Sequence, residues 1–142
     1  MRSFIIRVAF VVLPVSGMVA GCSGQIDQLP TTPDPVITTE TFSGTLTING
    51  AQTHFVFLGA TGPVTATLTS LGDNPPSKVG FSLGTLAGTT CTSNPTLYND
   101  SAVVTTMLSG SVQTLAGSLC ARIYDTGALT EAVPYTFTVS HP

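Results

Sequence analysis

Charged residues are scarce in this 142-residue sequence, and tryptophan is absent. Asp, Glu, Lys and Arg together make up only 8% of the residues, and there are two histidines. So few bases exclude a protein that neutralises a row of phosphates, and we expect no nucleic-acid partner. Binding to anionic lipid headgroups through side chains is disfavoured for the same reason.

Sequence motifs of hydrolases are also missing. There is no G-x-S-x-G elbow and no H-E-x-x-H pair. A histidine-based triad would have to use His54 or His141. We expect His54 to point outward from a strand and His141 to lie at a frayed end. Paired carboxylates for glycosidic cleavage cannot be picked out. We therefore predict that the protein is not an enzyme. The alternative is a hydrolase in which His54 lies beside an acid.

The N-terminal stretch has the order of a secretory signal. Arg2 and Arg7 form a basic end, residues 8–15 are almost wholly apolar, and small residues lead to Cys22. The apolar part is too short to span a bilayer. Val19-Ala20-Gly21-Cys22 resembles the lipobox of bacterial lipoproteins. The resemblance implies a signal peptide of residues 1–21 and a diacylglycerol on the Cys22 thiol. The alternative is a free cysteine behind an ordinary signal peptide.

Removal of residues 1–21 changes the charge and sets the expected location. Lys78 and Arg122 then stand against seven acids, so the formal net charge is 2 − 7 = −5. Membrane attachment would rest on the acyl chains at Cys22, and two or more chains anchor stably. The lipobox resemblance implies the cell envelope. With Ser23 after the cysteine, it favours the outer membrane if the host is Gram-negative.

Two cysteines remain once Cys22 is assigned to lipid. Cys91 and Cys120 are expected to form a disulfide in an oxidising compartment. Closing a loop of this size would stabilise the fold by roughly 3 to 4 kcal/mol in the chain-entropy model. The alternative is a catalytic thiol, which would need a nearby base.

Residues 22–39 are predicted to be a Pro/Thr-rich tether. Pro30, Pro33 and Pro35 alternate with threonine and aspartate, and the apolar residues follow no period. Such a segment buries too little surface to offset its ordering entropy, and its prolines favour an extended form. Its physical use would be to hold a domain, residues 40–142, away from a membrane.

From Glu40 onward apolar and polar residues alternate, which is the period of a half-buried strand. Asn49-Gly50 predicts a hairpin, because both residues tolerate positive φ. Residues 84–101 read as a long irregular loop, and Ser109-Gly110 as a turn. The predicted strands are residues 42–48, 53–58, 64–70, 79–83, 102–108, 111–115, 119–124 and 133–139.

About eight short strands without a helical stripe predict an all-β fold. We expect an antiparallel β-sandwich, jelly-roll-like in topology. Segments of this chain resemble the bacterial pre-peptidase C-terminal domain, over residues 40–142. They are Gly44-Thr45-Leu46, Phe55-Val56-Phe57, residues 64–69 and residues 117–123. The resemblance implies an accessory module that sometimes binds calcium, matrix protein or polysaccharide. Leu119 departs from it, because that family usually has an aromatic there, and its acidic loop is not clear here.

Three aspartates in predicted loops are candidate metal ligands. Asp73, Asp100 and Asp125 could converge at one end of a sandwich, and calcium prefers oxygen ligands of this kind. Nothing in their spacing requires convergence, and there is no EF-hand run. The alternative is that they serve turns through side-chain to backbone hydrogen bonds. No cofactor is expected otherwise.

Tyr98-Asn99-Asp100 is the best candidate for a ligand-binding patch. Sugar sites use aromatic platforms, and without tryptophan the exposed candidates are Tyr98 and Tyr124. Asn99 and Asp100 would accept hydrogen bonds from sugar hydroxyls. Arg122 is predicted on the outward face of its strand, near Tyr124. The alternative is a tyrosine packed on a sheet edge. We therefore expect a lipid-anchored envelope module with a structural role, or one that binds an extracellular protein or glycan.

Overall fold

The computed structural model describes residues 33–113 and 118–142, which form strands and no helix. The predicted signal peptide and residues 22–32 of the predicted tether lie outside the described residues. None of the described residues forms a helix long and apolar enough to cross a membrane. The strands are β1 (Thr38–Leu46), β2 (Ala51–Val56), β3 (Gly62–Ser70), β4 (Val79–Ala87), β5 (Thr90–Ala102), β6 (Met107–Val112), β7 (Leu119–Tyr124) and β8 (Val133–His141).

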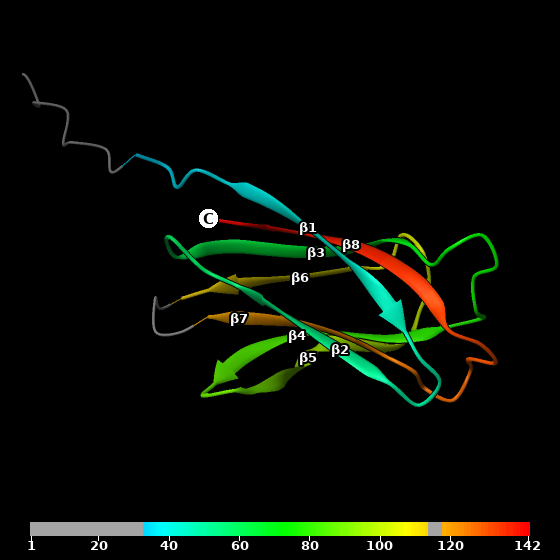
Figure 1. The fold of residues 1–142 in the computed structure, drawn as a ribbon. Coiled ribbons are helices and arrows are strands. Elements are labelled where there is room, and N and C mark those ends of the chain that lie inside the picture. The colour runs from blue at the N-terminus through cyan, green and yellow to red at the C-terminus, as the bar shows by residue number, and fades with distance from the viewer. Residues whose placement is uncertain (1–32, 114–117) are drawn as a thin grey trace, which may run out of the picture. The chain divides into compact units, whose positions relative to one another are not determined.

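The eight strands form four antiparallel pairs that are nested in sequence, with the first strand paired to the last and the two middle strands paired to each other. β1 pairs with β8, β2 with β7, β3 with β6 and β4 with β5. Two further pairings, β3 with β8 and β4 with β7, join these ribbons into sheets of order β1-β8-β3-β6 and β2-β7-β4-β5 (Figure 1). This nested order is that of a jelly roll, so the predicted fold class is confirmed.

The apolar side chains of both sheets meet in one core. Along β8, Val133, Tyr135, Phe137 and Val139 are buried, as the alternation predicted. The rings of Phe137 and Phe81, which come from opposite sheets, lie 5.3 Å apart between centroids. A fully buried side chain of this size contributes roughly 1.5 to 3 kcal/mol. The core therefore holds the two sheets face to face.

The region between residues 84 and 112 differs from the prediction. Residues 84–101 are not an irregular loop, because β4 and β5 form a hairpin whose turn contains Gly88 at φ 64°. Ser109-Gly110 is not a turn either and lies inside β6. The true turn, residues 103–106, has Thr105 at φ 78°. Glycine and proline made this region resemble a loop, but pairing with β4 supplies the hydrogen bonds of β5.

Asn49-Gly50 makes a turn, but the predicted hairpin is wrong. Asn49 has φ 54°, and the Gly50 amide donates to the Thr47 carbonyl at 2.8 Å. The strands on either side belong to different sheets, because β1 pairs with β8 and β2 with β7. The turn therefore carries the chain from one layer of the sandwich to the other.

The predicted disulfide between Cys91 and Cys120 is confirmed. Its Cα atoms lie 5.8 Å apart, and it joins β5 to β7 across the end of β4. Cys120 is fully buried. The bond therefore fixes the β4–β5 hairpin tip to the strand that lies on the other side of β4.

Candidate functional site

Four polar or aromatic side chains gather on the outward face of the β2-β7-β4-β5 sheet. Tyr98 and Asp100 come from β5, and Arg122 and Tyr124 from β7. We call this set the tyrosine cluster. On β7 the alternate residues face the core, where Ala121 and Ile123 are buried. Since successive side chains of a strand point to opposite faces, Arg122 and Tyr124 point outward.

β4 lies between β5 and β7, which carry the tyrosine cluster, and its outward residues between them are small. Gly80 of β4 is opposite Tyr124, and Ser82 is opposite both Arg122 and Tyr98. A Cβ on Gly80 would overlap the Tyr124 ring. The ring therefore lies directly on the Gly80 backbone, which only a glycine allows.

The Tyr124 ring reaches across β4 to β5. Its hydroxyl donates a hydrogen bond to Oδ1 of Asp100. Burial, then this hydrogen bond and the charge of Asp100, raise the pKa of Tyr124 to about 12. The phenol is therefore neutral near pH 7 and keeps its proton on the Asp100 bond. The Arg122 guanidinium lies over the same ring, with Cζ 5.4 Å from its centroid, as a cation–π contact.

Two more predicted ligand residues can now be placed. Tyr98 is half exposed, at 50%, and its outward face is open to solvent. Asn99 alternates to the other side of β5, and its Oδ1 accepts a hydrogen bond from the Ser101 amide at 2.8 Å. The structure thus brings Tyr98, Asp100 and Tyr124 to one face. The Asn99 side chain instead bonds a backbone amide of its own strand.

A cavity of about 390 Å³ adjoins the tyrosine cluster on this face. It lies between β2 and the tip of the β4–β5 hairpin. Its lining residues are Ala51, Thr53, Thr89, Thr90, Cys91 and Arg122. Arg122 therefore belongs both to the cavity and to the tyrosine cluster. Nothing local in the sequence indicates this cavity, because only the fold brings Thr89 and Thr90, at the tip of the β4–β5 hairpin, close to β2.

The three candidate metal ligands have different surroundings. Asp100 accepts the Tyr124 hydroxyl, whereas Asp73 lines a cavity of about 250 Å³ with Asn74 and Glu131. Within the described ranges, no three His, Cys, Asp or Glu side chains are grouped so that they could hold a metal ion. Calcium binding stays a prediction.

Asp125 serves a turn, as the alternative reading of the loop aspartates held. Its Oδ2 accepts the Asn49 amide at 2.9 Å, and its Oδ1 accepts the amides of Gly127, Ala128 and Leu129. The Asn49 hydrogen bond is the largest of the effects that lower the pKa of this carboxyl. The side chain thus ties the β7–β8 loop to the turn between β1 and β2.

Both histidines lie elsewhere than expected. His54 does not point into solvent: its Nε2 lies 2.7 Å from the Tyr135 hydroxyl, and its ring packs on Phe42 and Phe137. Burial lowers the pKa of His54. The register of β2 is set by its pairing with β7, so His54 and Val56 face inward and Phe55 is 43% exposed.

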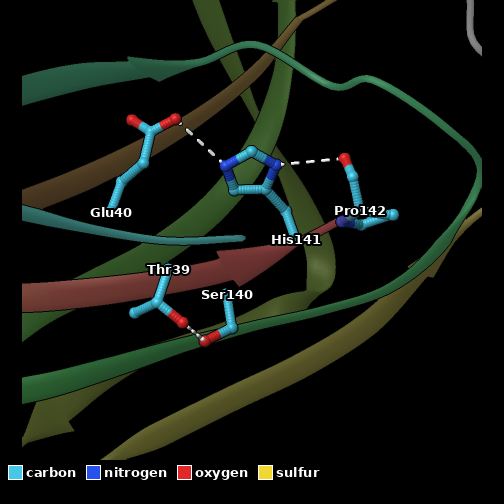
Figure 2. Close-up of polar contacts among 5 residues, drawn as sticks. All are labelled: Thr39, Glu40, Ser140, His141 and Pro142. Carbon is cyan, nitrogen blue, oxygen red and sulfur yellow. Dashed lines mark hydrogen bonds and ion pairs between the residues drawn. The ribbon is translucent and has the colours of Figure 1, made fainter. Parts of the chain in front are cut away.

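His141 is not at a frayed end. It is buried at 4% exposure, with Nε2 3.0 Å from Oε1 of Glu40 and Nδ1 3.2 Å from the Pro142 oxygen (Figure 2). Ser140 points the other way, and its hydroxyl lies 2.7 Å from that of Thr39 (Figure 2). The histidine therefore fastens β8 to β1 without activating the neighbouring serine.

Comparisons with known proteins show the fold alone. No family model matches the chain, and no curated protein matches it. The crystal structure of Yersinia pseudotuberculosis-derived mitogen superposes with a TM-score of 0.57 at 17% sequence identity. The match covers 75% of this chain and 88% of the mitogen chain. Similarity at this level establishes a shared β-sandwich architecture, and function must be argued from the site.

Proposed function

We propose that this chain is a non-catalytic, lipid-anchored module of the cell envelope that binds an extracellular glycan. The binding surface would be the outward face of the β2-β7-β4-β5 sheet. The observation that carries the proposal is the tyrosine cluster. It combines a half-exposed tyrosine, a second tyrosine held flat on Gly80, and a carboxylate and a guanidinium beside them.

This arrangement has the parts that a sugar site needs. The half-exposed Tyr98 ring offers an apolar face to the C–H side of a sugar, and its rigid side chain loses little entropy on binding. Asp100 and Arg122 provide an acceptor and donors for ring hydroxyls. Because Tyr124 is fixed by its Asp100 bond, part of the site is preorganised before ligand binds.

A non-catalytic role is supported by the surroundings of the histidines. His54 is occupied by Tyr135, and His141 by Glu40 and Pro142. Nucleophilic catalysis would need an accessible hydroxyl or thiol within hydrogen-bond reach of such a base, and the hydroxyl beside His54 belongs to Tyr135, which is buried at 2% exposure. Among the described residues, Cys91 and Cys120 are joined in a disulfide, so neither offers a thiol.

Envelope attachment is proposed from the lipobox and the tether. Cys22 would carry the lipid, and the residues between it and the start of β1 at Thr38 would hold the sandwich off the membrane, at the outer membrane if the host is Gram-negative. The predicted tether of residues 22–39 thus loses its last two residues to β1. Mass spectrometry of the chain produced in a bacterium tests this. We expect a diacylglycerol on Cys22 and loss of membrane fractionation in Cys22→Ser. An unmodified Cys22 in the mature chain would leave the ordinary signal peptide as the explanation.

Glycan binding is tested by retention of the purified full chain on immobilised polysaccharides, followed by calorimetry with oligosaccharides of the retained type. Tyr98→Ala should weaken binding roughly three- to tenfold, the worth of an aromatic contact. Met107→Ala is the matched control, because Met107 is 61% exposed on the outward face of the other sheet. Retention on no polysaccharide, or equal losses in both variants, would contradict the proposal.

A further inference from the structure

The 390 Å³ cavity beside the tyrosine cluster has a lining unlike the rest of the surface. Three threonines and one arginine form its polar wall, and Ala51 and the Cys91 end of the disulfide complete it. A volume near 390 Å³ falls at the lower end of the range for small-ligand sites. It has room for about one sugar ring.

The arginine in this cavity has no carboxylate partner among the described residues. The ion pair found there is His141 with Glu40, on the other sheet. The guanidinium of Arg122 instead lies over the Tyr124 ring, 5.4 Å from its centroid, and faces the cavity. Since the chain has only four Lys and Arg in all, two of them in the predicted signal peptide, a free guanidinium in a cavity is a specific feature.

We infer that this cavity receives the carboxylate-bearing ring of a uronic acid within an acidic glycan. The inference rests on the proposed glycan-binding function and names its substrate class. The planar guanidinium matches a carboxylate with two parallel N–H···O bonds. Thr53, Thr89 and Thr90 line the same cavity, and a threonine hydroxyl can both donate a hydrogen bond to a sugar hydroxyl and accept one from it.

The charge of the cavity favours a carboxylate over a phosphate. One guanidinium balances one negative charge, and no second cation lines the cavity. A dianionic group would keep an uncompensated charge on a protein that is already acidic. The nearby Asp100 is bonded to the Tyr124 hydroxyl and does not line the cavity, and the repulsion from acids beyond about 8 Å is screened at physiological ionic strength, so Arg122 is the charge that a ligand in the cavity contacts.

The cavity and the tyrosine cluster would then bind neighbouring sugars of one glycan. Arg122 is shared by the cavity and the tyrosine cluster, so a uronic ring in the cavity places the next sugar of the chain toward Tyr124. The disulfide fixes Cys91, and with it the adjoining Thr90, relative to β7. The cavity wall is therefore preformed.

The experiment is calorimetric titration of the full chain with two probes. One is the α-1,4-linked galacturonic acid trimer, and the other is the same trimer with its carboxylates methyl-esterified. We expect the acid to bind at least tenfold more tightly than the ester. Arg122→Gln should remove that preference. Arg122→Lys should reduce it, because lysine keeps the charge but cannot form two parallel N–H···O bonds to a carboxylate. Lys78→Gln removes an equal charge from an exposed position and should leave the preference intact.

Equal affinity for acid and ester, a preference unchanged in Arg122→Gln, or failure of the acid to bind would each overturn the inference. A sulfated sugar that binds in place of the uronate would overturn it as well. Failure of the proposed function is distinguishable. If neutral sugars still bind in a Tyr98-dependent way, glycan binding stands and only the acidic preference falls. Circular dichroism of each variant verifies that it is folded.

Discussion

The two sheets present outward faces of opposite character. On the β1-β8-β3-β6 sheet, a row of hydroxyls runs through Thr39, Ser140, Thr65 and Ser109, one from each strand. Neighbours in this row approach to 2.7 Å and 3.3 Å between oxygens. On the β2-β7-β4-β5 sheet, the outward face carries two tyrosines, an arginine and an aspartate, which come from β5 and β7.

The difference arises in the central strands. β3 and β8 carry β-branched threonines outward, which cover the sheet evenly and suit a pleated surface. β4 carries Gly80, Ser82 and Gly84 outward, and so leaves a depression between its neighbours. The Tyr124 ring lies in this depression. Small outward residues on β4 thus give this sheet face a depression that the face of the other sheet does not have.

The largest expected effect comes from opening the disulfide, which only the β2-β7-β4-β5 sheet contains. Cys91→Ser combined with Cys120→Ser should lower the free energy of unfolding by roughly 3 to 4 kcal/mol. Urea unfolding with and without reductant measures it. The wild-type chain in reductant should unfold like the double variant. A wild-type chain indifferent to reductant would show that the bond adds nothing to stability.

A larger side chain at Gly80 should fill the depression on β4 in which the Tyr124 ring lies. Gly80→Val would drive the Tyr124 ring from its place and cost roughly 1 to 3 kcal/mol in unfolding free energy through overpacking. Glycan affinity should fall with it. Thr67→Val, outward on β3, is the matched control and should change stability by less than about 0.5 kcal/mol. Similar losses in both variants would erase the contrast between the two faces.

Tyr124→Phe tests the bond across β4 by its pH dependence. The pKa of Tyr124 is raised to about 12 in the fold. The unfolded phenol ionises near pH 10. The stabilisation is therefore complete below pH 10 and is lost as the pH rises toward 12. The difference in urea midpoint between wild type and Tyr124→Phe should shrink over that interval. If the difference in urea midpoint stayed constant from pH 9 to pH 12, the bond between Tyr124 and Asp100 would not contribute to stability.

His54 gives a smaller effect on the acidic side, at the inner edge where the two sheets meet. Burial lowers the pKa of His54, so the unfolded state binds its proton first as the pH falls below about 6.5. The wild-type chain should lose stability between pH 7 and pH 5, and His54→Gln should lose less. Thermal unfolding across that range measures it, with His141→Gln as the control for the other histidine. Identical slopes in the wild type and His54→Gln would argue against a lowered pKa.

The smallest effect is expected on the hydroxyl row. Thr39→Val removes one exposed hydroxyl contact and should change the unfolding free energy by less than about 0.5 kcal/mol. Calorimetry should find glycan affinity unchanged. A loss of affinity in this variant would move the binding surface to the β1-β8-β3-β6 sheet.

Local patterns predicted much of the fold, and their errors have a common cause. The alternation in β8 correctly indicated which residues are buried, because burial of one strand face follows directly from period two. The face of β2 was assigned wrongly, because Phe55 is more apolar than His54. Pairing with β7 decides that register, and a shift of one residue turns every side chain to the opposite face.

The site divides in the same way. Sequence alone indicated Tyr98, Asp100 and Tyr124 as candidates and placed Arg122 near Tyr124, since these inferences need only residue type and strand alternation. Tertiary structure alone decided that Asp100 bonds Tyr124 across Gly80, that Asn99 turns away, and that Thr89 and Thr90 wall a cavity with Arg122. These contacts join strands that are distant in sequence, and they depend on hydrogen-bond register and core packing, which no single segment carries.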